Sequence, residues 1–175
     1  MTQPHINDPL KRVRAILERR PETGRHEDGP ATARWAGGMR VVASHANGTE
    51  VPSDMPTELG GTGDLITPGW LFRAGLASCA TTSIAMAAAA DGVALTSLKV
   101  KATSWSDTRG LLGMAESNGQ PVFAGPGDVQ LAVRITAEGV PPERLRALVQ
   151  AAVARSPIPC ALQAATPLTL RIDTE

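Results

Sequence analysis

Aromatic residues and cysteines are scarce in this 175-residue chain, which contains no tyrosine, two phenylalanines, three tryptophans and only two cysteines. The core must therefore be built from Ala, Leu, Val, Ile and Met. A chain of this length fits one compact domain or one protomer of an intertwined oligomer. Two cysteines in such a chain are more readily interpreted as reactive thiols than as a structural disulfide.

The chain also lacks an excess of charge, since 17 basic and 17 acidic residues give a net charge of 0. This balance disfavours a nucleic-acid partner, which usually requires a basic face. We expect no membrane partner either, because no run approaches the roughly 18 apolar residues of a membrane span. Residues 1–30 are polar and charged and contain no apolar signal segment, so a cytoplasmic protein is expected. The three histidines lack metal-ligand spacing, and no metal site is predicted.

Residues 1–30 are interpreted as an N-terminal extension with a short amphipathic helix over 9–20. Asp8-Pro9 supplies a helix start, and apolar residues follow at helical spacing at Leu10, Val13, Ile16 and Leu17. The opposite face is basic, with Lys11, Arg12, Arg14, Arg19 and Arg20. That face could contact a nucleic acid or a membrane. Because the net charge is zero, we favour a solvated face on a helix whose other side packs against a partner surface.

The rest of the chain predicts an α+β fold with mostly antiparallel strands and two principal helices on one face of the sheet. We expect one strand or a pair of strands over 32–45 with a turn or bulge at Gly37-Gly38, then a hairpin turn at Asn47-Gly48 and a loop over 53–66. A long helix is expected from Thr67-Pro68 to about Ala90, followed by strands over 95–105 and 128–136. A helix over 141–155, a short helical turn over 156–165 and a closing strand through Leu168, Leu170 and Ile172 complete the expected order. The glycine-rich segment 106–127 is expected to hold one irregular strand over 121–124.

Cys79 lies in the middle of the long apolar helix, about 18 Å from the helix N-terminus at 1.5 Å per residue. The helix dipole acts mainly over the first turn and does not activate this thiol. A cation must therefore come from elsewhere, and the candidates are Arg34 and Arg40 on the amino-terminal strands and Arg73 on the same helix. Thr82 and Ser83 follow one turn later on the Cys79 face and could form hydrogen bonds there.

Cys160 follows Ser156-Pro157, which predicts a helix cap and first turn, and a helix N-terminus favours a thiolate. If Cys79 and Cys160 meet, the chain has a two-thiol redox centre. If they do not, Cys79 is a small core residue.

Two segments, residues 57–79 and 156–162, resemble the OsmC/Ohr family of organic-hydroperoxide reductases. They read Thr-Glu-Leu-Gly-Gly-Thr-Gly, Thr-Pro-Gly-Trp-Leu-Phe and Ala-Ser-Cys in the first segment, and Ser-Pro-Ile-Pro-Cys-Ala-Leu in the second. The likeness predicts an OsmC-like domain over 31–175 and implies an intertwined homodimer with the long helices buried centrally. It also implies that the helix cysteine is oxidised to a sulfenic acid by a peroxide, that a second cysteine condenses with it, and that an external dithiol (a lipoyl group in some members) restores the pair. No bound cofactor is implied.

Two positions depart from the family pattern. Gly69 stands where a carboxylate commonly orients the activating arginine, and Ser156 stands where the resolving cysteine is expected, four residues before Cys160. Arg40 lies nearest to the family's arginine position, with Arg34 as the reserve. The sequence thus predicts a thiol-dependent peroxidase with Cys79 as the attacking thiol, Cys160 as a relocated resolving thiol and Arg40 as the activator. The alternative is a non-catalytic OsmC-like protein that binds an apolar ligand or acts as a redox sensor.

Overall fold

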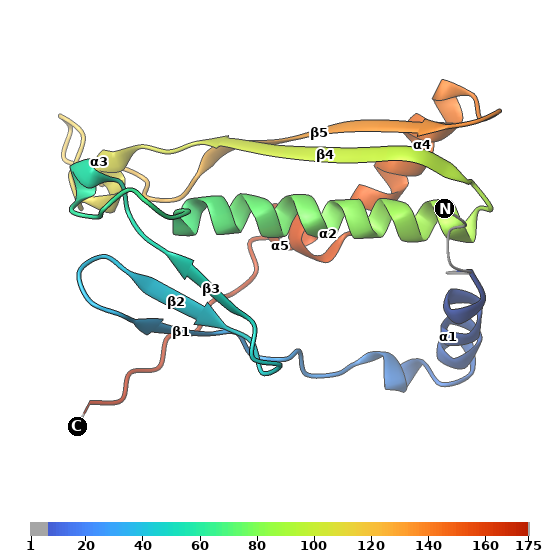
Figure 1. The fold of residues 1–175 in the computed structure, drawn as a ribbon, viewed down its shortest axis with the longest axis horizontal. Coiled ribbons are helices and arrows are strands. Elements are labelled where there is room, and N and C mark those ends of the chain that lie inside the picture. The colour runs from blue at the N-terminus through green and yellow to red at the C-terminus, as the bar shows by residue number, and fades with distance from the viewer. Residues whose placement is uncertain (1–6, 175) are drawn as a thin grey trace. The chain divides into compact units, whose positions relative to one another are not determined.

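The computed structural model describes residues 7–174 and divides into two compact units, residues 8–74 and a second that contains residues 75–174. The fold is α+β with antiparallel sheets, as predicted (Figure 1). Each unit has its own sheet. The helix that carries Cys79 runs through the boundary between the units.

The first unit contains a three-stranded antiparallel sheet in the order β1-β2-β3. Its elements are α1 (Asn7–Arg19), the 3₁₀ turn η1 (Pro21–Gly24), β1 (Thr32–Trp35), β2 (Val41–Ser44), β3 (Glu50–Ser53) and the 3₁₀ turn η2 (Thr57–Leu59). The predicted strand pair and both turns are confirmed. Gly37, Gly38 and Gly48 take positive φ angles of 101°, 57° and 88°, which glycine adopts at little steric cost.

Helix α1 forms where the sequence predicts an amphipathic helix, but its apolar side is not packed away. None of its residues is buried, and Val13 and Ile16 remain 53% and 47% exposed. The expected packing of this side against a partner surface stays a prediction.

Helix α2 (Pro68–Ala90) begins and ends where the sequence predicts, because both ends have hydrogen-bonded caps. The Thr67 hydroxyl accepts the backbone N–H of Trp70 at 3.1 Å, which caps the first turn. Gly92 takes a left-handed φ of 67°, and the N–H of Val93 returns to the carbonyl of Ala88 at 2.8 Å. This is the Schellman pattern of a helix C-terminus.

The second unit places an antiparallel ladder of β4 (Leu95–Trp105) and β5 (Gly127–Ala137) alongside α2 (Figure 1). It also contains α3 (Thr108–Leu111), α4 (Pro142–Val153) and α5 (Pro157–Gln163). Small and branched aliphatic side chains of α2 and α4 form the buried core, as the shortage of aromatic residues requires. The core residues are Ile84, Ala87, Ala88, Val93, Leu145, Leu148 and Ala152.

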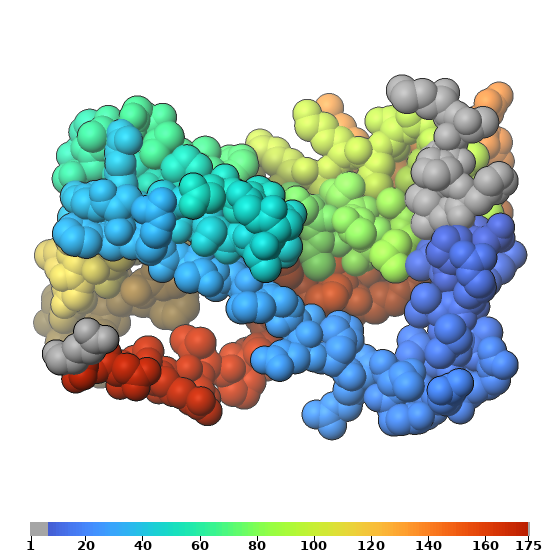
Figure 2. All heavy atoms as spheres, turned by 60° about the horizontal axis from the view of Figure 1, so that its bottom comes forward, coloured from blue at the N-terminus to red at the C-terminus, as the bar shows by residue number. Residues whose placement is uncertain are grey.

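Two sequence predictions in this unit are wrong. Residues 164–174 contain no strand, and Leu168, Leu170 and Ile172 are 95%, 79% and 73% exposed (the red strip in Figure 2). Alternating apolar residues form a strand only against a neighbouring edge, and neither described sheet pairs with this segment. Within 106–127, the structure has the short helix α3 and an isolated bridge between Ala115 and Pro121 in place of a strand over 121–124.

The expectation that no segment is long enough for a membrane span is also corrected. By length and composition α2 could cross a membrane, with a mean hydropathy of 1.2 over its most apolar 18 residues. This is weak support for a span, because the core helix of a soluble protein meets the same criterion.

Candidate functional site

The Cys79 thiol faces two serine hydroxyls and one backbone amide. Its Sγ lies 3.2 Å from Ser156 Oγ, and the N–H of Ile158 points at the sulfur from 3.5 Å. Ser83, one turn after Cys79 on α2, donates a hydrogen bond of 2.9 Å to the same Ser156 oxygen. The hydrogen-bonding role expected of Ser83 is thus realised, through Ser156.

The start of α5 puts these donors in place. Ser156 occupies the N-cap position and Pro157 follows at the first helical position, but the Ser156 side chain makes no capping hydrogen bond. Instead its hydroxyl is fully buried, at 0% exposure, against Cys79 and Ser83. The first N–H groups of a helix have no intrahelical acceptor, so that of Ile158 is available to the sulfur. The predicted capping role of Ser156 is replaced by a role at the thiol.

The hydrogen bonds around Cys79 form a short chain from Ser83 through Ser156 to the sulfur. A serine hydroxyl carries one hydrogen. Since Ser83 donates to Ser156, the Ser156 hydrogen is available to point at the Cys79 sulfur. The hydroxyl of Ser156 and the N–H of Ile158 thus both face the Cys79 sulfur, the atom that would act as the nucleophile in thiol chemistry.

Cys160 has a different partner from Cys79. It lies one turn along α5, and its Sγ donates to the carbonyl of Ala154 at 3.2 Å. Both cysteines are free thiols in the structure. The place beside the Cys79 sulfur is thus held by Ser156, and a Cys79–Cys160 disulfide stays a prediction.

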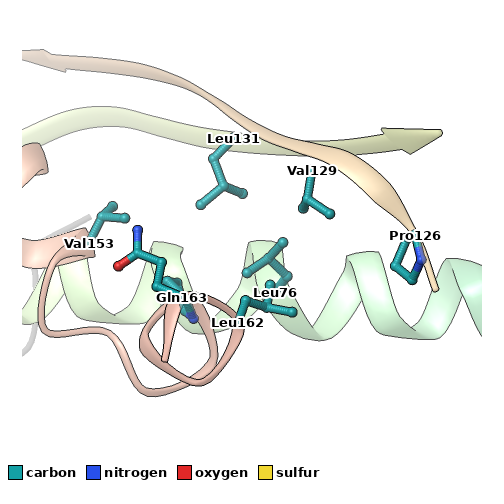
Figure 3. Close-up of a pocket in the computed structure, with 8 residues that line it drawn as sticks. Leu76, Pro126, Val129, Leu131, Val153, Leu162 and Gln163 are labelled. Carbon is teal, nitrogen blue, oxygen red and sulfur yellow. The ribbon is translucent and has the colours of Figure 1, made fainter. Parts of the chain in front are cut away.

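An apolar cavity of about 460 Å³ is lined by residues of α2, β5 and α5 (Figure 3). Val129 and Leu131 of β5 point into it towards Leu76 of α2 and Leu162 of α5. Pro126, Val153, Pro159 and Gln163 complete its lining. Two of its lining residues are near the thiol in sequence, since Leu76 lies one turn before Cys79 on α2 and Pro159 follows Ile158. It offers space for an apolar organic group.

Arg40, the predicted activator, is held by two carboxylates of the first unit. Its Nη2 donates to Asp64 Oδ2 at 2.6 Å and to Thr62 Oγ1 at 3.1 Å, and its Nε lies 3.6 Å from Asp54 Oδ2. Sequence reasoning missed all three partners. The available signal was an acidic residue on each side of the Gly-Gly-Thr-Gly run.

Asp54 anchors this loop from the inside. The carboxylate is 1% exposed and accepts hydrogen bonds from the N–H of Met55 at 2.7 Å and from the N–H and hydroxyl of Thr62 at 3.1 and 2.6 Å. The Thr62 hydroxyl also contacts Asp64 Oδ1. Hydrogen bonds from Thr62 are the main cause that lowers the pKa of Asp54, and they lower the pKa of Asp64 as well, with Arg40 contributing at both.

These shifts predict a dependence of stability on pH. A carboxyl group whose pKa is lower in the folded than in the unfolded chain contributes stability above its unfolded pKa, and this contribution is lost as the pH falls below about 4. We expect Asp54→Asn to lose less stability than the wild type between neutral pH and pH 3, as measured by urea unfolding. Glu58→Gln, an exposed carboxylate in the same loop, should follow the wild type. Equal pH dependence in all three proteins would contradict the assignment.

The other two candidate arginines have different surroundings. Arg34 pairs with Glu50 across the sheet at 3.7 Å, and both side chains are more than half exposed. Arg73 Nη1 lies 3.7 Å from the position that a Cβ atom would take on Gly69. Arg73 therefore approaches the place where the family pattern has a carboxylate.

The comparisons with known proteins identify the family of this fold and site. A family model described as OsmC-like protein matches residues 61–171, and the chain belongs to this family. A search of curated proteins found no match.

Solved structures of the family superpose on most of the chain. An OsmC-like protein from Mycoplasma pneumoniae is 17% identical with a TM-score of 0.65, and the match covers 79% of this chain and 89% of that one. An organic hydroperoxide resistance protein from Elizabethkingia anophelis is 23% identical with a TM-score of 0.58, covering 79% and 90%. A Vibrio cholerae protein named for organic hydroperoxide resistance is 25% identical with a TM-score of 0.54, covering 79% and 87%, and was solved with captopril in one active site.

Proposed function

We propose that this protein reduces organic hydroperoxides with Cys79 as the attacking thiolate. The observation that carries the proposal is the placement of the Ser156 hydroxyl and the Ile158 amide against the Cys79 sulfur, at 3.2 and 3.5 Å. Membership of the OsmC-like family and its hydroperoxide-resistance relatives support it. The apolar cavity would hold the organic part of the substrate.

In the first step, the Cys79 thiolate attacks the terminal oxygen of the hydroperoxide. A sulfur–oxygen bond forms, the oxygen–oxygen bond breaks, and the organic part leaves as an alcohol after taking up a proton. Cys79 becomes a sulfenic acid, oxidised by two electrons. In the second step, the Cys160 thiol condenses with it, which forms a disulfide and releases water. An external dithiol, of lipoyl or similar type, then reduces the disulfide and is itself oxidised to a disulfide. No bound cofactor takes part in these steps.

Arg40 is proposed to orient the peroxide and to favour the thiolate. The carboxylate that the family pattern expects is replaced by Gly69, and Asp64 and the buried Asp54 would supply the missing support, since both lie against Arg40. A buried carboxylate fixed by three hydrogen bonds holds its partner cation in one place more firmly than an exposed pair does.

A homodimer in the cytoplasm is proposed as the working form. Only 28% of the most apolar stretch of α2 is buried within the chain, and the apolar residues Leu168, Leu170 and Ile172 are exposed. A second copy that covers α2 and residues 168–172 would remove both apolar surfaces from water.

The experiment that tests the proposal is a non-reducing mass measurement after one equivalent of cumene hydroperoxide. We expect the wild type to lose two hydrogens through a Cys79–Cys160 disulfide, and Cys160→Ser to gain one oxygen that a sulfenic-acid reagent captures. Unchanged masses in both proteins would refute the peroxidase proposal. Oxygen gain in both proteins would retain Cys79 as the nucleophile and exclude Cys160 as the resolving thiol.

The second candidate function is the binding of an apolar ligand without catalysis, as a carrier or redox sensor. The cavity beside Leu76 and Leu131 is the observation that favours it. Leu131→Trp would fill this cavity and abolish ligand binding. Under the peroxidase proposal the same substitution should raise the KM for bulky hydroperoxides and leave turnover of hydrogen peroxide unchanged.

A further inference from the structure

Helix α1 has the composition and exposure of a helix that binds the surface of an anionic membrane. It lies outside the matched residues 61–171, so the family model does not account for it. All of its residues are exposed except Asn7 and Leu10, which are partly covered. The helix is the dark blue ribbon labelled α1 in Figure 1 and is dark blue in Figure 2.

The apolar residues of α1 form a single stripe along the helix. At roughly 100° per residue, Leu10, Val13, Ile16 and Leu17 fall within an arc of about 120°. Val13, Ile16 and Leu17, the last three of these residues, are 53%, 47% and 36% exposed. A continuous apolar stripe in contact with water is stabilised by burial in an apolar phase.

Basic side chains border this stripe on both sides. Arg14 follows Leu10 around the helix on one side, and Arg12 precedes Ile16 on the other, each about 40° away. Long basic side chains in these positions can extend to lipid phosphates while the stripe enters the acyl region. Residues 7–20 contain five basic and two acidic residues, a net charge of +3 in a chain whose total is 0. The positive charge is therefore concentrated on this helix.

Other occupants fit the helix less well. A nucleic acid would contact the basic side chains but would leave the apolar stripe exposed to water. An apolar groove of a protein would cover the stripe but would not by itself require arginines along both of its edges. Anionic lipid headgroups above an acyl layer match both features together.

We propose that α1 anchors the protein peripherally to membranes that contain anionic lipids, with Val13, Ile16 and Leu17 inserted and Arg12 and Arg14 on the headgroups. This inference departs from the expectation of no membrane partner, and it does not depend on the proposed peroxidase activity. A helix of 13 residues is too short to span a bilayer, so α1 would lie in the headgroup region along the membrane surface.

The test is co-sedimentation of the full chain with phosphatidylcholine vesicles, with and without phosphatidylglycerol. We expect binding only to the anionic vesicles, weakened by salt. Arg12→Glu/Arg14→Glu should reduce binding by at least about tenfold. Val13→Ser/Ile16→Ser, which keeps the charge, should also reduce it by about tenfold. Lys99→Glu/Lys101→Glu, the same charge change on exposed positions of β4, should bind like the wild type.

Each other outcome overturns the proposal. Absence of binding, or equal loss in the β4 control, would exclude α1 as a membrane anchor. If vesicle binding fell in the arginine variant but not in the serine variant, α1 would adsorb electrostatically without inserting its apolar stripe, as it would to any acidic polymer. Cys79→Ser should bind vesicles like the wild type, because α1 does not depend on the thiol. The membrane test therefore remains valid even if the peroxidase proposal fails.

Discussion

Cys79→Ser should abolish hydroperoxide consumption, with a fall of at least about 10³-fold in the rate measured with cumene hydroperoxide and an external dithiol. Serine keeps the size of the side chain but lacks a nucleophile that ionises under these conditions. Because Cys79 is only partly buried and its contacts are polar, the variant should fold like the wild type, which circular dichroism would check. Activity that survives this substitution would contradict the proposed chemistry.

A graded companion to this experiment is Ser156→Ala. Removing the hydroxyl takes one donor from the Cys79 sulfur, and a hydrogen bond to a charged group contributes on the order of 1.5–3 kcal/mol. The rate of peroxide attack should fall by roughly 10- to 100-fold, which places this variant between the wild type and Cys79→Ser. Thr81→Ala is the matched control, because Thr81 bonds to the carbonyl of Ala77 on its own helix and not to the thiol.

Gly61→Ala should destabilise the protein by about 3 kcal/mol or more, as measured by urea unfolding. A Cβ on Gly61 would lie 1.8 Å from the carbonyl oxygen of Met55 and 2.7 Å from Asp54 Oδ1, so the backbone must move. Movement there separates Asp54 from Thr62, and we expect the arrangement around Arg40 to be lost with it.

The matched control is Gly29→Ala. A Cβ at Gly29 meets no atom within 4 Å, and its backbone is not in the left-handed region. This variant should change stability by no more than a few tenths of a kcal/mol. If Gly61→Ala changed the free energy of unfolding as little as Gly29→Ala, the close approach of Gly61 to Met55 would have no role in holding the loop.

The elements that the sequence predicted well are those with local stop and start signals. Thr67-Pro68 and Gly92 bound α2, and Gly37-Gly38 and Asn47-Gly48 mark the turns on either side of β2. The closing strand through Leu168 and Leu170 was wrong because alternation describes only one face of a strand and says nothing of its partner edge.

The candidate site was predicted only in part for a similar reason. Cys79 stood out by its place in an apolar helix, and Ser83 by its helical spacing from Cys79. The contacts of Ser156 with Cys79, and of Asp54 with Thr62, join residues that no local pattern connects. Asp54 in particular resembled an ordinary loop carboxylate, and only its burial reveals its role.

The short contact between Cys79 and Ser156 leaves no space for a further atom between the sulfur and the hydroxyl oxygen. Their sulfur and oxygen atoms are 3.2 Å apart, and the Ser156 hydroxyl is enclosed on its other side by Ser83. An oxygen bonded to the Cys79 sulfur therefore has to point away from Ser156 or push the start of α5 outwards. In the second case, the larger volume of an oxidised Cys79 side chain would shift the turn of α5 that carries Cys160.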